Sequence, residues 1–225
     1  MRKFIEVNKM KKVKEKTCKN PDCKKKFTPN YSSTQVVCSV RCSQELARIK
    51  EREKAMKEGK KQLSEMKIET HSKEFRADLQ REVNKLSRMI DSHFGLDTCI
   101  DCGKKFGKQI DAAHLHSRGS NSSLRWNLHN LHSAKSDCNQ YSNKHESGYK
   151  NGLSERYGEK YAKYVIEELP LIYKEVKVTN KEVHEKLKLV RYLVKTFGTF
   201  DLLNPINARN LFNTLIGIYT NDFKL

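Results

Sequence analysis

The sequence predicts an α+β fold in which a small mixed core is flanked by helices. Three observations support this class: seven cysteines fall into clusters of short spacing, apolar residues recur at helical spacing on both sides of the second cluster, and a candidate strand lies at residues 109–116. We expect five segments, which are a basic arm (1–17), a cysteine-rich module (18–43), a helical arm with a supporting helix (44–95), a core (96–158) and a helical carboxy-terminal region (159–225).

The composition favours a nucleic acid as the partner. The 225 residues carry a formal net charge of +18, with 36% hydrophobic and 32% charged residues. Such an excess of Lys and Arg suits a polyanion, and the alternative is a generic basic surface. A membrane surface fits less well, because the chain has no apolar run of about 18 residues and its first residues lack the apolar region of a signal peptide. We therefore expect no membrane partner and a cytoplasmic location.

The first cysteine cluster predicts a structural zinc site. Its members are Cys18, Cys23, Cys38 and Cys42. A reducing cytosol disfavours disulfides, whereas two close pairs of thiolates provide the four soft, tetrahedral ligands that Zn²⁺ prefers. A shell of four thiolates has no position for water, so we expect this ion to be structural. The basic residues beside the cluster have the charge pattern of a module that contacts the DNA backbone: Lys24, Lys25 and Lys26.

Helical patterns lie on both sides of the core segment. Residues 43–66 read as a polar helix with sparse apolar positions, which we expect to be a solvated spacer. A packing stripe at helical spacing follows in Phe75, Leu79, Val83, Leu86, Ile90 and Phe94. Two more stripes lie in the carboxy-terminal region, separated by a loop at 198–205: Val183, Leu187, Val190 and Val194, and then Leu211, Phe212, Leu215, Ile216 and Tyr219.

The second cysteine cluster encloses a series of polar motifs. Cys99 and Cys102 form a turn of the zinc-knuckle type, and the other half of the site would come from the region of Cys138. The candidate strand 109–116 and a polar turn at 118–123 lie between these halves. The motifs along this segment, in order, are Asp111-x-x-His114, Arg125-Trp126-Asn127, Asn130-x-His132 and Cys138-Asn139.

This order of motifs resembles the NinG/Rap recombination family of phage lambda. The resemblance covers about residues 14–197, including the four-cysteine module, the charged helix after it and the segment 149–158. It implies a nuclease core of the HNH (ββα-metal) type behind an amino-terminal zinc knuckle. It also implies cleavage of branched DNA, such as D-loops and Holliday junctions, during phage recombination in a bacterial host.

Phosphodiester hydrolysis gives these residues consistent roles. The reaction needs a water nucleophile, a general base and a cation that holds the scissile phosphate. His114 suits the base, because histidine titrates near neutrality, and Asp111 and Asn139 offer the hard oxygen ligands that Mg²⁺ or Mn²⁺ accepts. Zinc bound at Cys138 would fix the direction of the adjacent Asn139. We expect His116 to face the same way as His114 on the strand, as a second metal ligand or a phosphate contact.

Three further residues have expected supporting roles. Asn130 is expected to bond to backbone across the site and to hold His114 in place. Arg118 and Arg125 suit phosphate oxygens, with simple surface solvation as the alternative. Trp126, the only tryptophan, is expected in the core rather than as a platform on which bases stack.

Two positions depart from the family pattern. Lys135 stands where the family has a cysteine, and residues 143–145 replace the family's Ser-Gly-Asn. The second zinc site is therefore left with three cysteines, and His132 is the first candidate for a fourth ligand. A site that has lost its metal and is held by packing is the alternative. The other candidates for the fourth ligand are His129 and His145, with Asp137 as a poorer one.

The function predicted from the sequence is a Mg²⁺- or Mn²⁺-dependent endonuclease that acts on branched DNA. The preference for branched DNA comes from the resemblance alone. The alternatives are a non-catalytic, zinc-containing DNA-binding recombination protein and a sequence-specific HNH endonuclease. A four-way junction has two symmetric strands to cut, so a homodimer is expected for its resolution. The carboxy-terminal helices would form its interface or pack on their own domain.

Overall fold

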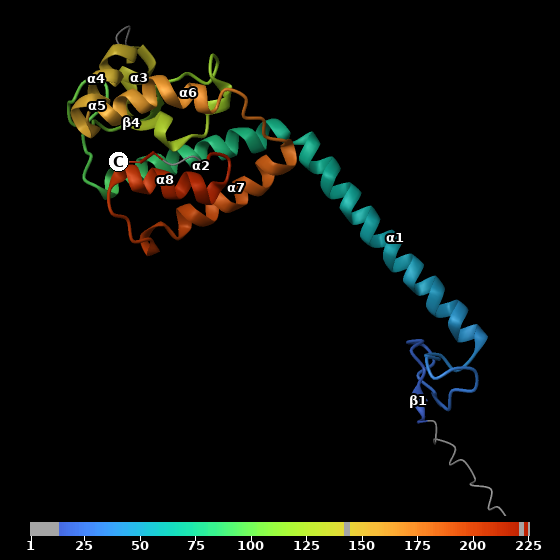
Figure 1. Cartoon of the computed structure of the whole chain (residues 1–225). Helices are drawn as coiled ribbons and strands as arrows, with labels where there is room; N and C mark the ends of the chain where they lie inside the picture. Colours follow the sequence, from blue (N-terminus) through green and yellow to red (C-terminus); the bar gives the residue numbers. More distant parts are fainter. Residues whose placement is uncertain (1–13, 142–144, 221–222, 225) are drawn as a thin grey trace, which may run out of the picture. The chain divides into compact units, whose positions relative to one another are not determined.

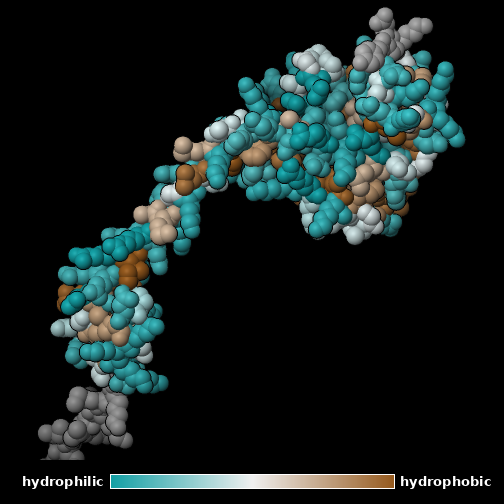
Figure 2. Space-filling model, turned by 180° about the vertical axis from the view of Figure 1, so that it is seen from behind, coloured by the Kyte–Doolittle hydropathy of each residue, from teal (hydrophilic) through white to brown (hydrophobic). Residues whose placement is uncertain are grey.

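The computed structural model describes residues 14–141, 145–220 and 223–224, and the chain divides into two compact units, residues 1–66 and 67–225 (Figure 1). The fold is helix-rich with a few short strands, which confirms the predicted mixture of elements. Figure 2 shows hydrophilic residues over most of the visible surface of both units. Among the described residues, no helix has both the length and the apolar character that crossing a membrane requires.

The first unit consists of a small cysteine module and most of a polar helix, whose last residues belong to the second unit. Strands β1 (Lys16–Thr17) and β2 (Lys26–Phe27) pair antiparallel, and α1 runs from Val40 to Thr70. Only Cys42 is buried along the whole of α1, which confirms a polar, solvated helix. The expected basic arm lies mostly outside the described residues, and its last two residues form β1.

The four cysteines of this module come together, as the sequence predicted. Their sulfur atoms all lie within 4.8 Å of one another, with Cys23 Sγ 3.5 Å from Cys38 Sγ and Cys38 Sγ 3.6 Å from Cys42 Sγ. Bonds of about 2.3 Å to a tetrahedral zinc ion place sulfur atoms roughly 3.8 Å apart, so the arrangement fits this ion. The Asn20 amide donates to Glu45 Oε2 at 2.7 Å and thereby ties the module to α1.

The second unit has one hydrophobic core built around α2 (Ser72–His93). The predicted stripe is confirmed, because Leu79, Val83, Leu86 and Ile90 are fully buried. Helices α7 (Asn180–Lys195) and α8 (Pro205–Ile216) lie beside α2 (Figure 1). The other helices are α3 (Ser136–Tyr141), α4 (His145–Tyr157), α5 (Glu159–Lys163) and α6 (Leu169–Ile172), with a π-helical turn at Tyr164–Glu168 and 3₁₀ turns at Ser122–Leu124, Leu128–Asn130 and Phe197–Thr199.

A two-stranded hairpin crosses this core. Strand β3 (Ile110–His114) pairs antiparallel with β4 (Leu131–Lys135), and His114 stands opposite Leu131. The short helix α3 follows β4 directly. The observed β3 lies inside the strand expected at 109–116 but ends two residues earlier, at His114.

Local sequence signals set the carboxy-terminal helices. Thr179 and Glu182 form a reciprocal capping box at the start of α7, and the Asn204 side chain accepts two backbone N–H groups at the start of α8. The buried positions of both helices pack inside their own unit, although Leu211 and Leu215 of the stripe predicted for α8 stay exposed.

Helix α4 approaches the turn between Cys99 and Cys102 so closely that glycine is required. A Cβ atom at Gly152 would lie 1.8 Å from the Ile100 carbonyl oxygen, and one at Gly148 would lie 2.5 Å from that of Asp101. Arg156 on the same helix donates to the Thr98 carbonyl at 2.8 Å. The knuckle turn is therefore fastened along one face of α4.

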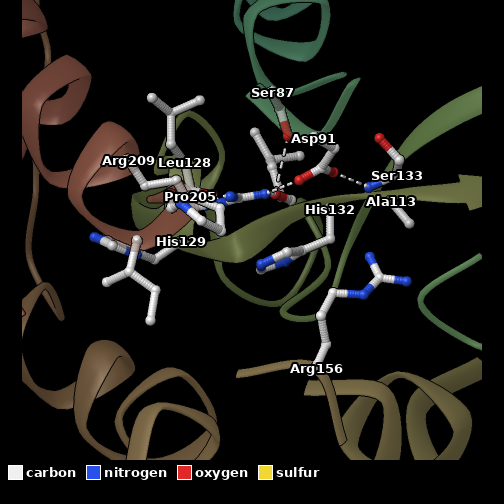
Figure 3. A network of polar contacts seen from close by, with 12 residues as sticks. Ser87, Asp91, Ala113, Leu128, His129, His132, Ser133, Arg156, Pro205 and Arg209 are labelled. Carbon is white, nitrogen blue, oxygen red and sulfur yellow. Dashed lines mark hydrogen bonds and ion pairs between the residues drawn. The ribbon is translucent and has the colours of Figure 1, made fainter. Parts of the chain in front are cut away.

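A buried ion pair joins α2 to α8 next to β4 of the hairpin (Figure 3). Arg209 of α8 and Asp91 of α2 are 0% and 1% exposed, and their side chains meet at 2.5 Å. The other carboxylate oxygen of Asp91 accepts the Ser133 backbone N–H of β4 at 2.7 Å. The guanidinium also donates to the carbonyls of Leu128, Leu131 and Pro205. A buried charge is tolerated only when it has a counter-ion and hydrogen-bond partners, and the Arg209 guanidinium has both.

Protein purified without added metal should contain about one to two zinc ions per chain, one for each cysteine cluster. Cys38→Ser should lower the content by about one ion and unfold the module, because the binding energy of such a metal is also folding energy. Elemental analysis and proteolysis measure the two effects, with Ser43→Ala as the control that keeps both. A zinc content below about half an equivalent would contradict the structural role of the metal.

Asp91→Ala should lower the free energy of unfolding by about 3–5 kcal/mol, because it leaves the Arg209 guanidinium buried without a counter-ion. Urea unfolding provides the measurement. The control is Asp78→Ala, which breaks two partly exposed pairs, with Arg81 and Arg191, and should cost about 0–1 kcal/mol for each. Replacing both partners, with Asp91→Leu and Arg209→Met, should restore much of the loss. An equal loss of unfolding free energy for Asp91→Ala and Asp78→Ala would show that the buried pair contributes no more to stability than an exposed one.

Candidate active site

An open cavity of about 770 Å³ lies beside the hairpin of the second unit. Four elements contribute to it: α2, β3 with the loop after it, α3 and α4. Three of the sequence-predicted residues line this cavity together: Asp111, His114 and Asn139. Arg118 lines it as well, from the loop that follows the strand. The hairpin and α3 thus gather residues that are as much as 28 positions apart in sequence.

Asp111 and Asn139 are in direct contact. The Asn139 amide donates to Asp111 Oδ2 at 3.1 Å, and the Gln140 amide donates to the same oxygen at 3.2 Å. Burial disfavours the charged carboxylate, but these hydrogen bonds and the charge of Arg88 hold the pKa of Asp111 below its ordinary value. The carboxylate is therefore ionised at neutral pH and offers hard oxygen ligands. Asn139 contacts it through the amide nitrogen, and the amide oxygen of the same side chain is a second hard donor beside it.

His114 is the last residue of β3 and lies largely buried at the cavity. Its Nε2 contacts the Arg125 carbonyl oxygen at 2.9 Å, so this nitrogen carries the proton and donates it. Burial, together with the charges of Arg118 and Arg125, lowers the pKa of His114 to about 4. The ring is therefore neutral at pH 7, and the lone pair is on Nδ1.

Asn130 acts on the backbone just beyond His114, close to the role expected for it. Its side chain accepts the His116 N–H at 2.8 Å and donates to the His116 carbonyl at 3.0 Å. Its own carbonyl accepts the Leu115 N–H at 3.2 Å. These bonds continue the pairing of the hairpin after β3 has ended, so the strand end that carries His114 is held on both sides.

His145 connects the cavity to the knuckle turn. Its Nδ1 lies 3.0 Å from Asp101 Oδ2, and its Nε2 lies 3.3 Å from the His114 carbonyl oxygen. Both partners are acceptors, so the ring satisfies them only when both nitrogens carry protons. The hydrogen bond to Asp101 accordingly raises the pKa of His145. Because Asp101 lies between Cys99 and Cys102, this histidine bonds the second cysteine cluster to the backbone of His114.

Other predicted residues lie away from this cavity. The His116 ring bonds to the Val165 carbonyl of the π-helical turn at 2.8 Å, because the strand ends at His114 and the two side chains no longer share a face. Arg125 lines a neighbouring cavity. Trp126 is 3% exposed and part of the core, as expected. Three exposed lysines belong to the first unit: Lys24, Lys25 and Lys26.

The second cysteine cluster has three members. The sulfur atoms of Cys99, Cys102 and Cys138 lie within 4.8 Å of one another, with Cys138 Sγ 3.6 Å from Cys102 Sγ. The set of soft thiolates can hold a zinc ion. The backbone N–H of Lys135 donates to Cys99 Sγ at 3.2 Å, so the position where the sequence departs from the family pattern does lie at the cluster.

The structure does not bring His132 to this cluster. Its Nδ1 contacts the Tyr149 hydroxyl at 2.9 Å, inside a group of aromatic rings. The reason is the alternation of a strand: His132 and Lys135 are three residues apart on β4 and so point to opposite faces. The other candidates for a fourth ligand do not reach the cluster either. Among the described residues, only the three cysteines have ligand atoms close enough to one another, and His129, His145 and Asp137 do not.

Sequence reasoning missed the contribution of α2. Asn84 and Arg88 line the main cavity from this helix, although the sequence was read only for its apolar stripe. The signal was present, because polar and basic residues recur every three or four positions along the side of that stripe. The polar side chains of Gln140 and Glu146 also line the cavity and were not predicted.

Comparison with known proteins adds a family to this geometry. No curated protein and no solved structure gives a match to the chain. The model of the family described as bacteriophage lambda NinG protein matches residues 10–196, which is more than half of the sequence and contains both cysteine clusters and the cavity residues Asp111, His114 and Asn139. The chain therefore belongs to the bacteriophage lambda NinG protein family.

Proposed function

We propose that the chain is a metal-dependent DNA endonuclease with a core of the HNH (ββα-metal) type. One observation carries the proposal: the contacting pair Asp111 and Asn139 lines the same open cavity as a neutral His114. Two hard oxygen donors beside an imidazole base form the minimal set for phosphodiester hydrolysis. The succession of β3, β4 and α3 agrees with a ββα arrangement, since β3 supplies Asp111 and His114 and α3 supplies Asn139.

The proposed substrate is branched DNA. Membership of the NinG family connects the chain with phage recombination, where joined and crossing strands are the intermediates to be cut. The net charge of +18 supports a polyanionic substrate. The expected place of action is the cytoplasm of the bacterial host.

Asp111 and Asn139 would hold the catalytic cation. Carboxylate and amide oxygens are ligands that Mg²⁺ and Mn²⁺ accept, and the ionised state of Asp111 fits this role. Such an ion, when bound, neutralises the charge that develops on the phosphate oxygens. Cys138 precedes Asn139 on α3, so a zinc ion in the second cysteine cluster would also restrict the direction of the Asn139 side chain.

His114 would accept the proton of the attacking water. The bond from Nε2 to the Arg125 carbonyl fixes the tautomer and leaves the Nδ1 lone pair as the acceptor. A pKa of about 4 keeps the free ring in the basic form but makes it a weak base. A bound phosphate would offset the charges of Arg118 and Arg125 and so raise this pKa towards a more effective value.

His145 would act as a positioning residue. Its cationic ring donates to both the Asp101 carboxylate and the His114 carbonyl, which restrains the backbone that carries the base. When the ring loses its proton, one of the two bonds is broken.

His114→Ala should lower the cleavage rate by about 10²–10⁴-fold while DNA affinity changes little, because one base performs the proton transfer and many side chains contact phosphate. Cleavage assays on junction, flap and linear DNA with Mg²⁺ or Mn²⁺ provide the measurement. Asn139→Ala should be partly rescued by raising the Mg²⁺ concentration. His116→Ala, whose ring bonds outside the cavity, is the control and should keep more activity.

Three results of these assays would change the proposal. Wild-type cleavage of His114→Ala would show that another group is the base. A wild-type protein that binds DNA but cuts none of the three substrates would instead be a non-catalytic DNA-binding recombination protein. Cleavage of linear DNA at one defined sequence would identify a sequence-specific endonuclease.

The free energy of unfolding should show the titration of His145. A histidine whose pKa is raised by folding contributes stability that is complete below its ordinary value of 6.5 and is lost as the pH rises through the raised value. The difference in stability between the wild type and His145→Gln should therefore shrink as the pH rises above 6.5. The cleavage rate of the wild type should fall over the same range. His71→Gln, an exposed change just before α2, is the control, and a pH-independent difference for His145→Gln would contradict the double-donor arrangement.

A further inference from the structure

We propose that one face of α2, together with Arg118 and Arg125, forms a cationic groove that holds the phosphate backbone of one DNA strand as it leaves the cavity of Asp111 and His114. This inference rests on the proposed nuclease function for its substrate. It assigns a binding role to a helix whose sequence signal is mainly that of a core helix.

A second cavity, of about 450 Å³, adjoins the first. The two cavities share Asn84 and Arg118 in their lining, so they are direct neighbours along α2. Among the described residues that line the second cavity, every charged side chain is basic: Lys73, Arg76, Arg81, Arg118 and Arg125. A concave surface of one sign of charge attracts the opposite charge strongly, and phosphate is the anion that the proposed substrate supplies.

The spacing on α2 matches an extended ligand. Lys73, Arg76, Gln80, Asn84 and Arg88 follow one another at intervals of three or four residues, which places them on one face of the helix. The segment from residue 73 to residue 88 is about 22 Å long at 1.5 Å per residue. At a rise of about 3.4 Å per nucleotide of one strand, this corresponds to roughly six phosphates.

The guanidinium groups in this groove are held in place. Arg125 and Arg76 lie 5.0 Å and 5.9 Å from the centroid of the Trp126 ring, which therefore orients both cations. Arg76 also donates to the Val178 carbonyl at 2.9 Å. Burial and the repulsion from Arg118 and Arg76 lower the pKa of Arg125, so a bound anion would relieve an existing concentration of positive charge.

The groove is suited to contact the backbone rather than the bases. Trp126 is buried beneath the arginines and offers no exposed ring for stacking. The neutral members, Gln80 and Asn84, already bond to each other at 2.8 Å. Contacts to phosphate are sequence-independent, which suits an enzyme that has to follow strands of any sequence.

The test compares two pairs of substitutions in the full-length, zinc-loaded protein carrying His114→Ala, so that the DNA stays intact. Lys73→Gln with Arg118→Gln removes two charges from the groove, and Lys188→Gln with Lys195→Gln removes two exposed charges of α7 that line neither cavity. Fluorescence anisotropy with a labelled four-way junction, repeated over a range of salt concentrations, measures both affinity and salt dependence.

The groove variant should lower the slope of log K against log salt by about 0.9 for each phosphate that is no longer neutralised, and so by nearly two units, with roughly tenfold weaker binding. The α7 variant should change neither. An unchanged slope for the groove variant, or an equal drop for both variants, would overturn the proposal. If the slope of log K against log salt falls for RNA duplexes and not for DNA, the choice of DNA as the bound nucleic acid is wrong.

A second measurement tests the direction of the strand. With active enzyme, single methylphosphonate substitutions, which remove one phosphate charge at a time, are moved along the cleaved strand. Interference should be confined to one side of the cut and extend over about six positions. Interference of equal extent on both sides would contradict a single groove along α2.

The outcomes distinguish the two proposals. If no DNA is cut but the groove variant still shows the reduced slope, the proposed nuclease function is wrong and the proposed groove is supported. If DNA is cut and the slope is unchanged, the groove fails.

Discussion

The carboxylate of Asp91 and the guanidinium of Arg209 meet in a place that water does not reach, and the second unit is built around their contact. Neither group could be buried alone, because an unpaired charge in the interior is strongly destabilising. Each therefore requires the element that carries the other to be in position. Since Asp91 also accepts the Ser133 N–H, the pair fixes where β4 lies against α2 and α8.

The cavity depends on that placement of β4. The strand holds its partner β3 in register, and β3 carries Asp111 and His114. At one end of β4, Asn130 bonds the backbone beyond His114, and at the other end α3 begins and presents Asn139. On the outer side, His145 connects the same backbone to the knuckle turn, against which the glycines of α4 pack. The proposed base is thus held by backbone contacts from three directions, although none of these contacts is part of the chemistry.

The sequence predicted what depends on local periodicity and on short spacing. Apolar stripes indicated α2 and α7, and paired cysteines indicated both clusters. The family resemblance, together with the chemistry of phosphodiester hydrolysis, led us to expect Asp111, His114 and Asn139 together. Two of the failures, at His116 and His132, have one physical cause, which is that the direction of a side chain depends on where a strand ends and which face it uses. His116 was placed beside His114 on a strand that stops before it, and His132 was assigned to a metal although its face of β4 meets the aromatic core. The basic face of α2 was missed for another reason. The segment that carries Arg118 and Arg125 lies far away in sequence, and only the fold brings it beside this face to form a groove.

The separation of Asp91 and Arg209 along the chain has a consequence for biosynthesis. The two residues are 118 positions apart, so a ribosome that adds about 5–20 residues per second exposes Asp91 for several seconds before its counter-ion is made. During that interval Asp91 has no counter-ion, so the core of the larger unit cannot form without burying an unpaired charge. The cysteine module, whose ligands lie between Cys18 and Cys42, can already take up its metal. During translation the amino-terminal module would therefore be complete while the rest of the chain is still unfolded, and the cavity of Asp111 and His114 would form only after Arg209 has left the exit tunnel.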